Sequence, residues 1–213
     1  MARQSQSAEN KAGRPLANKG QLHAITTITE HIIQEMEDKA NSAEAWREPF
    51  RRLLHGGPGT GKSHVITSLR ELFAKLGWQQ GVHYQVVALQ AVMAQLIGGD
   101  TIHHACGIKA FKKGAEYDDG TISQQTTAKR VLQWRWLFID EISMISAKLL
   151  AELDMKLRSV VRDLVPSKRD GQNETRPFGG LNVLCCGDFW QLDPPEGGSL
   201  ANIPVEWISR AYK

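Results

Sequence analysis

The sequence lacks long hydrophobic runs, spaced cysteine pairs and internal repeats. No apolar stretch approaches the ~20 residues that a membrane-spanning helix needs, and no apolar segment follows the N-terminus as in a signal peptide. The three cysteines, Cys106, Cys185 and Cys186, show no metal-ligand spacing, and adjacent residues of a strand point to opposite faces. These absences argue against a membrane protein and a structural zinc site. We expect a soluble, intracellular protein.

Size and composition are those of an ordinary globular domain. The chain has 213 residues, of which 41% are hydrophobic and 23% charged, and this is enough to bury a substantial core. The formal net charge of +3 is compatible with a polyanionic partner but does not require one.

The first twenty residues differ from the rest of the chain. They are small, polar and basic, and they show no hydrophobic periodicity, so residues 1–20 are predicted to be a flexible basic leader. Their composition is similar to that of an organelle transit peptide, but no amphipathic face emerges, which favours a disordered tail. The remaining residues, 21–213, form the predicted domain.

Short apolar strands alternate with amphipathic helices along residues 21–213. Helical spacing is found at 21–36, at 65–76 before Gly77, and at 149–164 before Pro166. Strands are predicted at 50–54, 84–89, 136–139 and 181–186, an exposed turn or hairpin at 109–125, and a polar loop at 168–176. This alternation predicts an α/β domain with a mainly parallel sheet and helices on both faces.

A glycine-rich loop between the first strand and its helix carries the strongest chemical signal. Residues 56–63 match G-x-x-x-x-G-K-[ST], whose backbone N–H groups and helix N-terminus bind phosphate. Lys62 is predicted to neutralise the β- and γ-phosphates of ATP, and the Ser63 hydroxyl to bind Mg²⁺. Because all eight residues fit the motif, including the lysine and the serine, a simple glycine turn is an improbable interpretation. The predicted nucleotide-binding residues of this segment are Gly56, Gly57, Pro58, Gly59, Thr60, Gly61, Lys62, Ser63 and His64.

Two acids end the strand at 136–139. Asp140 is the predicted second magnesium ligand, and Glu141 the residue that polarises the attacking water. Without the glycine loop, two solvated acids at a strand end would be the simpler interpretation.

Two further segments follow strand ends, where open α/β sheets bind ligands. Gln191 has an amide that can contact the γ-phosphate or a water. Phe189 is predicted to lie in the core, and Trp190 is either a core residue or a platform for bases. Thr101 and His103 could contact a DNA backbone, although Thr101 could equally cap a helix.

Five segments occur in this order: GGPGTGKS, GGDTIHHACG, LFIDEISMIS, RPFGG and CGDFWQLDPP. Together they resemble the Pif-type (petite integration frequency) DNA helicases, a RecD-like branch of superfamily 1, over residues 21 to about 195. The resemblance implies a RecA-like P-loop NTPase domain that uses ATP to move 5′ to 3′ along single-stranded DNA. It further implies roles in DNA repair, recombination and telomere maintenance, and a nuclear or mitochondrial location.

The resemblance also assigns roles to single residues. It makes Gln21 the residue that reads adenine, and Gln191 the γ-phosphate sensor that couples nucleotide state to DNA grip. It assigns Lys62 and Ser63 to phosphate and magnesium, Asp140 and Glu141 to metal and water, and Thr101 and His103 to single-stranded DNA. The catalytic set is therefore Lys62, Glu141 and Gln191.

Two departures from the family pattern are visible. Residues 88–91 read Ala-Leu-Gln-Ala where the family usually has Ala-Pro-Thr-Gly, so the threonine and glycine that approach the DNA backbone are missing. Asp193 stands between Leu192 and Pro194, which interrupts the usual Q-L-P-P.

The sequence ends at Lys213, before the second RecA-like motor domain that the resemblance implies. That domain supplies arginine to the transition state, and such arginines are worth ~10³–10⁵ in rate in related systems. We therefore expect residues 1–213 alone to hydrolyse ATP weakly and not to unwind DNA. The alternatives are another P-loop enzyme, such as an AAA-type ATPase or a nucleotide kinase, and an ATP-binding module without turnover.

Overall fold

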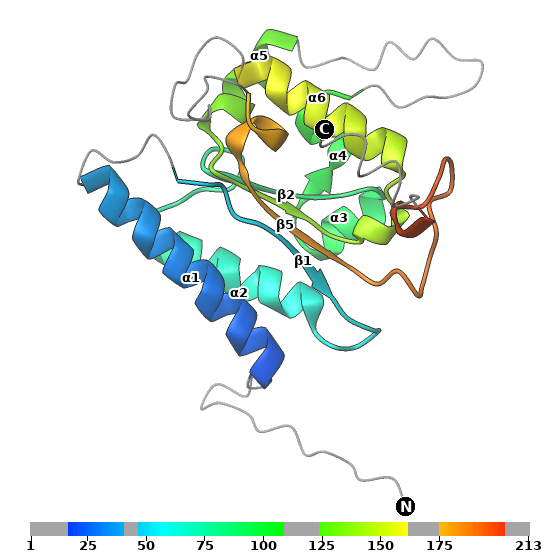
Figure 1. The fold of residues 1–213 in the computed structure, drawn as a ribbon, viewed down its shortest axis with the longest axis horizontal. Helices are drawn as coiled ribbons and strands as arrows, with labels where there is room; N and C mark the ends of the chain where they lie inside the picture. The colour runs from blue at the N-terminus through cyan, green and yellow to red at the C-terminus, as the bar shows by residue number, and fades with distance from the viewer. Residues whose placement is uncertain (1–16, 41–46, 109–123, 162–174, 203–213) are drawn as a thin grey trace, which may run out of the picture.

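The computed structural model describes residues 17–40, 47–108, 124–161 and 175–202. A single sheet forms the middle of the molecule, with helices on both of its faces (Figure 1). Residues 1–16 of the predicted leader lie outside the described residues, so the proposed division at residue 20 stays a prediction.

The sheet has five strands in the order β1-β5-β4-β2-β3, and every neighbouring pair is parallel. The predicted parallel α/β fold is therefore confirmed, as are its four strands. A fifth strand of two residues was not predicted, because so short a segment has no readable pattern. The strands are β1 (Arg51–His55), β2 (Tyr84–Ala88), β3 (Asp100–Thr101), β4 (Trp136–Ile139) and β5 (Asn182–Gly187).

Alternate residues of the central strands enter two separate hydrophobic clusters, one on each face of the sheet. Trp136 and Phe138 of β4 belong to the first cluster, whereas Leu137 and Ile139 belong to the second. The adjacent cysteines behave likewise, since Cys186 is buried in the first cluster and Cys185 packs against the second. Burial on both faces explains why these strands are almost continuously apolar.

Helices α1 (Lys19–Ala40), α2 (Lys62–Lys75) and α3 (Ala91–Leu96) contribute to the first cluster. The predicted apolar face of α1 is confirmed at Ile28 and Ile32, which are almost fully buried. At Met36, the last apolar residue of the predicted face, the prediction was wrong: this side chain is 49% exposed, because the inward-facing residue of this turn is Glu35.

Helices α4 (Ile102–Cys106), α5 (Gln124–Gln133) and α6 (Ala147–Val161) cover the opposite face. Leu153 and Leu157 anchor α6, as its spacing predicted. The short 3₁₀ helices η1 (Ile142–Met144), η3 (Pro177–Gly180) and η4 (Leu200–Asn202) complete the described elements. The predicted turn at 109–125 and loop at 168–176 lie largely outside the described residues, as does Pro166.

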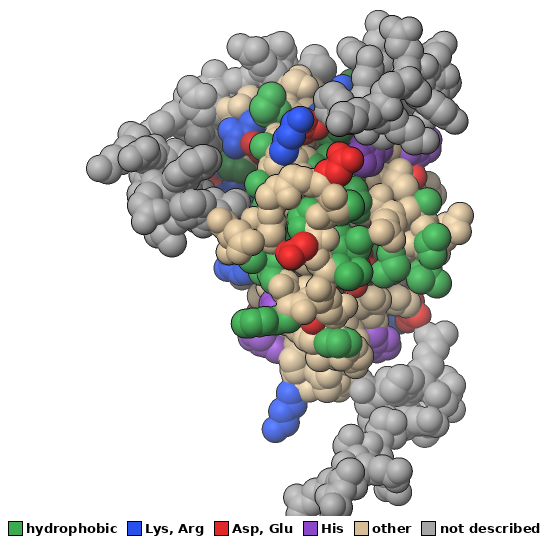
Figure 2. Space-filling view, turned by 90° about the vertical axis from the view of Figure 1, so that its right-hand side faces the viewer, with side chains coloured by type: hydrophobic (Ala, Val, Ile, Leu, Met, Phe, Trp, Pro, Cys, Tyr) green, Lys and Arg blue, Asp and Glu red, His purple; other side chains and the backbone are tan. Residues whose placement is uncertain are grey.

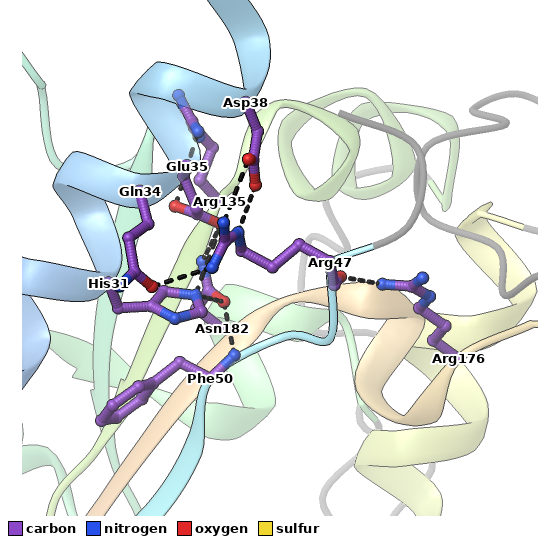
Figure 3. A network of polar contacts seen from close by, with 9 residues as sticks. All are labelled: His31, Gln34, Glu35, Asp38, Arg47, Phe50, Arg135, Arg176 and Asn182. Atoms are coloured by element: carbon purple, nitrogen blue, oxygen red, sulfur yellow. Dashed lines mark hydrogen bonds and ion pairs between the residues drawn. The ribbon is translucent and has the colours of Figure 1, made fainter. Parts of the chain in front are cut away.

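A polar network fastens the second half of α1 to the amino-terminal edge of the sheet (Figure 3). The Asn182 side-chain oxygen accepts a hydrogen bond from the Phe50 N–H (2.7 Å), and its amide donates to Glu35 (2.8 Å). Glu35 also lies 3.5 Å from Arg135 and 3.7 Å from His31. These contacts fix α1 at the edge of the sheet that lies away from the glycine loop.

None of the helices in the described part of the chain is both long and apolar enough to cross a membrane.

Candidate nucleotide site

The carboxyl ends of β1, β5 and β4 lie next to one another in the sheet. His55 is in register with Gly187, and Cys185 with Ile139, so the loops that follow these three strands begin side by side. Figure 1 shows the glycine loop and the segment after β5 at this same edge. The predicted catalytic residues Lys62, Glu141 and Gln191 all come from these loops.

The glycine loop turns directly from β1 into α2. Gly61 has φ 81° and ψ 32°, a left-handed conformation that favours glycine, and its carbonyl accepts from the N–H groups of His64 and Val65. Helix α2 then begins at Lys62, so its N-terminus faces the loop. The structure thus forms the phosphate cradle that the motif predicts.

The Lys62 side chain curls back over this loop. Its Nζ donates to the carbonyl oxygens of Gly56 at 2.6 Å and Gly57 at 3.2 Å, and the Thr60 hydroxyl donates to Gly57 at 2.8 Å. The ammonium therefore lies within the concave side of the loop, where the phosphates of a nucleotide would bind.

Asp140 faces the same space. Its side chain is buried, and this burial, together with the charge of Glu141, raises its pKa above the ordinary value. The backbone N–H of Glu141, the charge of Lys62 and the Ser63 side chain act in the opposite direction, because all three lie near the carboxylate. Among the described atoms, Oδ1 of Asp140 is buried without a hydrogen-bond partner.

This donor set suits magnesium. Mg²⁺ is commonly held by one or two protein oxygens together with substrate phosphates and water, and it needs no dedicated protein cage. The Ser63 hydroxyl and the unpartnered Asp140 oxygen supply such a pair beside the phosphate cradle. No cluster of three or more His, Cys, Asp or Glu side chains with metal-binding geometry occurs among the described residues.

Glu141 adopts an uncommon backbone conformation, with φ 52° and ψ 50°. A residue other than glycine in the left-handed region costs roughly 1–2 kcal/mol. The conformation begins η1, whose Met144 N–H donates to the Glu141 carbonyl (3.0 Å). Gly187 lies against this turn: a Cβ there would come within 2.8 Å of the Ile142 side chain and 3.0 Å of its backbone nitrogen. The close approach fixes the turn of Glu141 against β5.

The loop after β5 is organised by Asp188, which is almost fully buried. Its Oδ2 accepts a hydrogen bond from the Gln191 side-chain amide at 2.8 Å, and its Oδ1 accepts from the Trp190 N–H at 3.0 Å. These bonds, together with the charges of Lys62 and His55, lower the pKa of Asp188. The carboxylate thus holds the predicted sensor on the side of the sheet edge that carries Lys62.

His55, the last residue of β1, contacts this loop directly. Its Nε2 lies 3.6 Å from Oδ1 of Asp188, and its ring stacks on Phe189 with centroids 6.2 Å apart and an interplanar angle of 8°. Phe189 is partly buried against the second cluster, in agreement with the prediction. Trp190 is 88% exposed and is therefore not a core residue.

Gln21 joins the amino-terminal end of α1 to the glycine loop. Asn18 and Gln21 form a capping box, in which each side-chain oxygen accepts from the other residue's backbone N–H at 2.9 Å. The Gln21 amide donates to the Thr60 carbonyl at 2.8 Å. The structure therefore places Gln21 against the glycine loop, and its role in reading adenine stays a prediction.

Thr101 and His103 lie apart from this site, because β3 is at the opposite end of the sheet from β1. Thr101 caps α4 by accepting a hydrogen bond from the His104 N–H (3.2 Å), which is the simpler of its two predicted roles. His103 is partly buried, which lowers its pKa, and Glu152 opposes this shift. Their contact with DNA stays a prediction.

A pocket of about 440 Å³ lies beside His103. It is bounded by the end of β2, by η1 and the start of α6, and by the segment after β5; its lining residues are Leu89, His103, Met144, Ser146, Lys148, Leu149, Glu152, Pro195, Glu196 and Gly197. Leu89, which belongs to the Ala-Leu-Gln-Ala departure, therefore lines this pocket, and Pro195 lines it two residues after Asp193. Figure 2 faces this edge of the molecule and shows apolar groups across its middle, with few basic side chains among them.

The sequence model of the PIF1-like helicase family matches residues 25–210. This chain belongs to the PIF1-like helicase family. Among curated relatives, the ATP-dependent DNA helicase PIF1 of Saccharomyces cerevisiae (strain YJM789) is 32% identical over 163 residues, which cover 74% of this chain and 17% of the relative. The human ATP-dependent DNA helicase PIF1 is 31% identical over 144 residues, or 68% of this chain and 20% of the relative. The PIF1-like chain thus spans about a fifth or less of the length of these two proteins.

Solved structures agree with the fold of this PIF1-like chain. A crystal structure of Pif1 helicase from Candida albicans superposes with a TM-score of 0.58 and 24% identity, over 85% of this chain and 34% of that one. Bacteroides Pif1 bound to single-stranded DNA gives a TM-score of 0.56 and 24% identity, over 85% of this chain and 34% of that one. At this identity the likeness establishes the fold alone, and it confirms the RecA-like domain.

Two residues of the PIF1-like site were not predicted from its sequence. Asp188 follows a buried strand just as Asp140 does, so the same pattern could have found it. His55 carries no such signal, because its contacts depend on the pairing of β1 with β5. His55 ends the strand that leads into the glycine loop, and Asp188 lies in the loop that carries Gln191.

Proposed function

We propose that this PIF1-like chain is the nucleotide-binding motor domain of an ATP-dependent DNA helicase. The convergence of Lys62, Ser63, Asp140 and the Asp188–Gln191 pair on one edge of the sheet carries this proposal. The relatives named ATP-dependent DNA helicase PIF1 support the reaction, and the Bacteroides Pif1 structure with single-stranded DNA supports the partner.

Each residue then has a part in phosphoryl transfer from ATP to water. The Lys62 ammonium leaves the carbonyls of Gly56 and Gly57 for the β- and γ-phosphates, whose oxygens also accept from the loop N–H groups. Ser63 and Asp140 would hold Mg²⁺, which supplies charge neutralisation between the two phosphates.

Two side chains act on the terminal phosphate itself. The left-handed turn at Glu141 directs its carboxylate to orient and deprotonate the attacking water. The Gln191 amide, held by Asp188, exchanges that contact for the γ-phosphate and so reports whether ATP or ADP is bound.

The proposed DNA contact lies at the carboxyl ends of the strands that are farther from Lys62. We infer that single-stranded DNA crosses the edge formed by β2, β3 and α4, with Thr101 and His103 as contacts, and that movement is 5′ to 3′. Because few basic side chains lie across the middle of this edge, we expect hydroxyl, imidazole and backbone groups to carry much of the binding (Figure 2). From the family resemblance alone, we further propose an intracellular location in the nucleus or mitochondrion, and roles in DNA repair, recombination and telomere maintenance.

Phosphate release by residues 1–213, measured with Mg²⁺-ATP and increasing single-stranded DNA, tests this function. We expect weak hydrolysis that DNA stimulates, and a loss of ~10²-fold in Lys62→Ala, because a preorganised charge on the transferred phosphate is removed. Lys75→Ala is the matched control, since Lys75 is an exposed lysine in the last turn of the same helix.

The alternatives give different outcomes. Hydrolysis that ignores DNA would indicate another class of P-loop enzyme, and ATP binding without hydrolysis, even with DNA, would indicate a binding module. On a forked duplex we expect no strand separation by residues 1–213 alone, because translocation requires two motor domains that close alternately on the nucleotide. Robust unwinding by these residues would contradict this account.

A further inference from the structure

His55 links two loops that otherwise belong to different strands. It ends β1 and immediately precedes Gly56, the first residue of the phosphate loop. Its ring nevertheless lies over the loop that follows β5, where it contacts Asp188 and Phe189. This cross-connection is possible because His55 and Gly187 are paired in the sheet, and because the Gly56 N–H donates to the Gly187 carbonyl at 3.3 Å.

The carboxylate that His55 contacts is also the one that orients Gln191. One oxygen of Asp188 faces both the His55 imidazole and the Trp190 N–H, and the other accepts from the Gln191 amide. Asp188 is almost fully buried, whereas the His55 side chain is 42% exposed. His55 is therefore the outer partner of a buried hydrogen-bonding centre.

We propose that His55 is a positioning residue that ties the phosphate loop to the sensor loop, so that Gln191 is held ready for the γ-phosphate. The proposal rests on the proposed ATP-binding function. His55 acts through Asp188 and Phe189 and does not itself touch the reacting atoms. Its loss would loosen Asp188, and with it the orientation of Gln191, while the phosphate loop and Lys62 remain in place.

A purely structural role predicts a different result. The His55 ring is too exposed to contribute much to the core, and exposed ion pairs stabilise proteins little, so its removal should change global stability only slightly. If His55 served the phosphate loop alone, ADP binding would weaken together with AMP-PNP binding, because the loop also holds the β-phosphate. A defect transmitted through Gln191 leaves ADP binding unchanged, because ADP has no γ-phosphate.

Calorimetric titrations with Mg²⁺ and either ADP or the nonhydrolysable analogue AMP-PNP test this inference. They compare the wild-type chain with His55→Ala, His55→Gln, Gln191→Ala and the double variant His55→Ala/Gln191→Ala. His55→Gln keeps an N–H donor at a reach similar to Nε2 and tests for rescue. His23→Ala is the control, because His23 is an exposed histidine on the surface of α1.

We expect His55→Ala to weaken AMP-PNP binding about fivefold, near the upper limit for a partly exposed ion-pair contact, and to leave ADP binding unchanged. His55→Gln should recover most of the loss, and His23→Ala should match the wild type. In the double variant the AMP-PNP defect should be no larger than in Gln191→Ala alone, because the two residues act in series.

Equal losses for both nucleotides, unchanged binding in His55→Ala, or additive losses in the double variant would each overturn the role of His55. These results leave the proposed function intact, because the wild-type chain still binds both nucleotides. If the wild-type chain bound neither nucleotide, the proposed function itself would fail, and this inference with it. Thermal unfolding of each variant shows whether a loss reflects misfolding, and His55→Gln provides the test if His55→Ala does not fold.

Discussion

The left-handed backbone of Glu141 is an unfavourable conformation at a residue to which we assign the attacking water. Strained residues of this kind persist where surrounding packing enforces them, and here Gly187 and η1 do so. This backbone conformation turns the chain sharply after Asp140, so the side chains of Asp140 and Glu141 have different surroundings. Asp140 remains buried beside Ser63, and Glu141 is more exposed.

This strain predicts an unusual order of stabilities. Glu141→Gly should be more stable than Glu141→Ala by about 1 kcal/mol, because glycine adopts positive φ without steric cost. Alanine is the matched comparison, since both variants lack the carboxylate and only alanine keeps a Cβ. Urea unfolding measures the difference. Equal stabilities, or a more stable alanine variant, would show that the turn is not strained in solution.

At the level of residues, the sequence predicted side chains whose chemistry follows from a local motif. Lys62 and Ser63 follow a spacing that leaves few alternatives, and Asp140 ends a plainly apolar strand. His55 could not be predicted in this way, since its partner is distant in sequence and its neighbours suggest only a strand end. Asp188, the hydrogen-bond partner of Gln191, was also not predicted. The sequence shows it as part of the segment CGDFWQLDPP and does not show that it is buried.

Among the elements, prediction succeeded where burial produces a clear pattern. The strands β2, β4 and β5 are buried on both faces and are mostly apolar, so their positions were readable. Helix α5 is mostly polar and attaches through few side chains, chiefly Val131 and Trp134, the latter just past its end, so its periodicity gave little signal. The end of α1 beyond Ile32 is held by polar contacts, which hydrophobic spacing cannot show.

The contacts of α1 with the sheet predict a dependence of stability on pH. Burial by itself raises the pKa of Glu35, but the neighbouring His31, the hydrogen bond from Asn182 and the charge of Arg135 outweigh it, so the pKa lies below its ordinary value. A carboxyl group with a depressed folded-state pKa stabilises the fold above its ordinary pKa, and this stabilisation is lost as pH falls through the folded-state value.

Glu35→Gln should therefore lower the free energy of unfolding by about 1–2 kcal/mol at pH 7, and the difference from wild type should shrink as the pH falls below about 4.5. Urea unfolding between pH 3 and 7 measures this, with Glu30→Gln, an exposed glutamate of the same helix, as control. A difference that stayed constant over this range would show that the Glu35 charge does not hold α1 to the sheet.

The whole molecule is a sheet shielded on both sides, and its cysteines report that shielding. Burial raises the pKa of Cys106 and Cys185 to about 12, and it raises the pKa of Cys186 well above its ordinary value. Because the thiolate is the reactive form, all three should be nearly inert in the folded protein at neutral pH.

We therefore expect Ellman's reagent at pH 8 to label fewer than one thiol per folded chain within minutes, and all three after denaturation in guanidinium chloride. Any labelling of the folded chain should occur mainly at Cys185, because it is less buried than Cys106 and Cys186. Fast labelling that disappears in Cys185→Ser would mean that the second face of β5 opens readily.

The place of β1 in the sheet has a consequence for how the protein is made. Its partner is β5, and the Phe50 N–H that leads into β1 bonds to Asn182, 132 residues later in the chain. A ribosome releases the phosphate loop long before it releases the strand that supports it, and closing so long a loop is entropically costly. The nascent chain should thus acquire its ability to bind a triphosphate abruptly and late, when β5 emerges, pairs with β4 and gives β1 a strand to join.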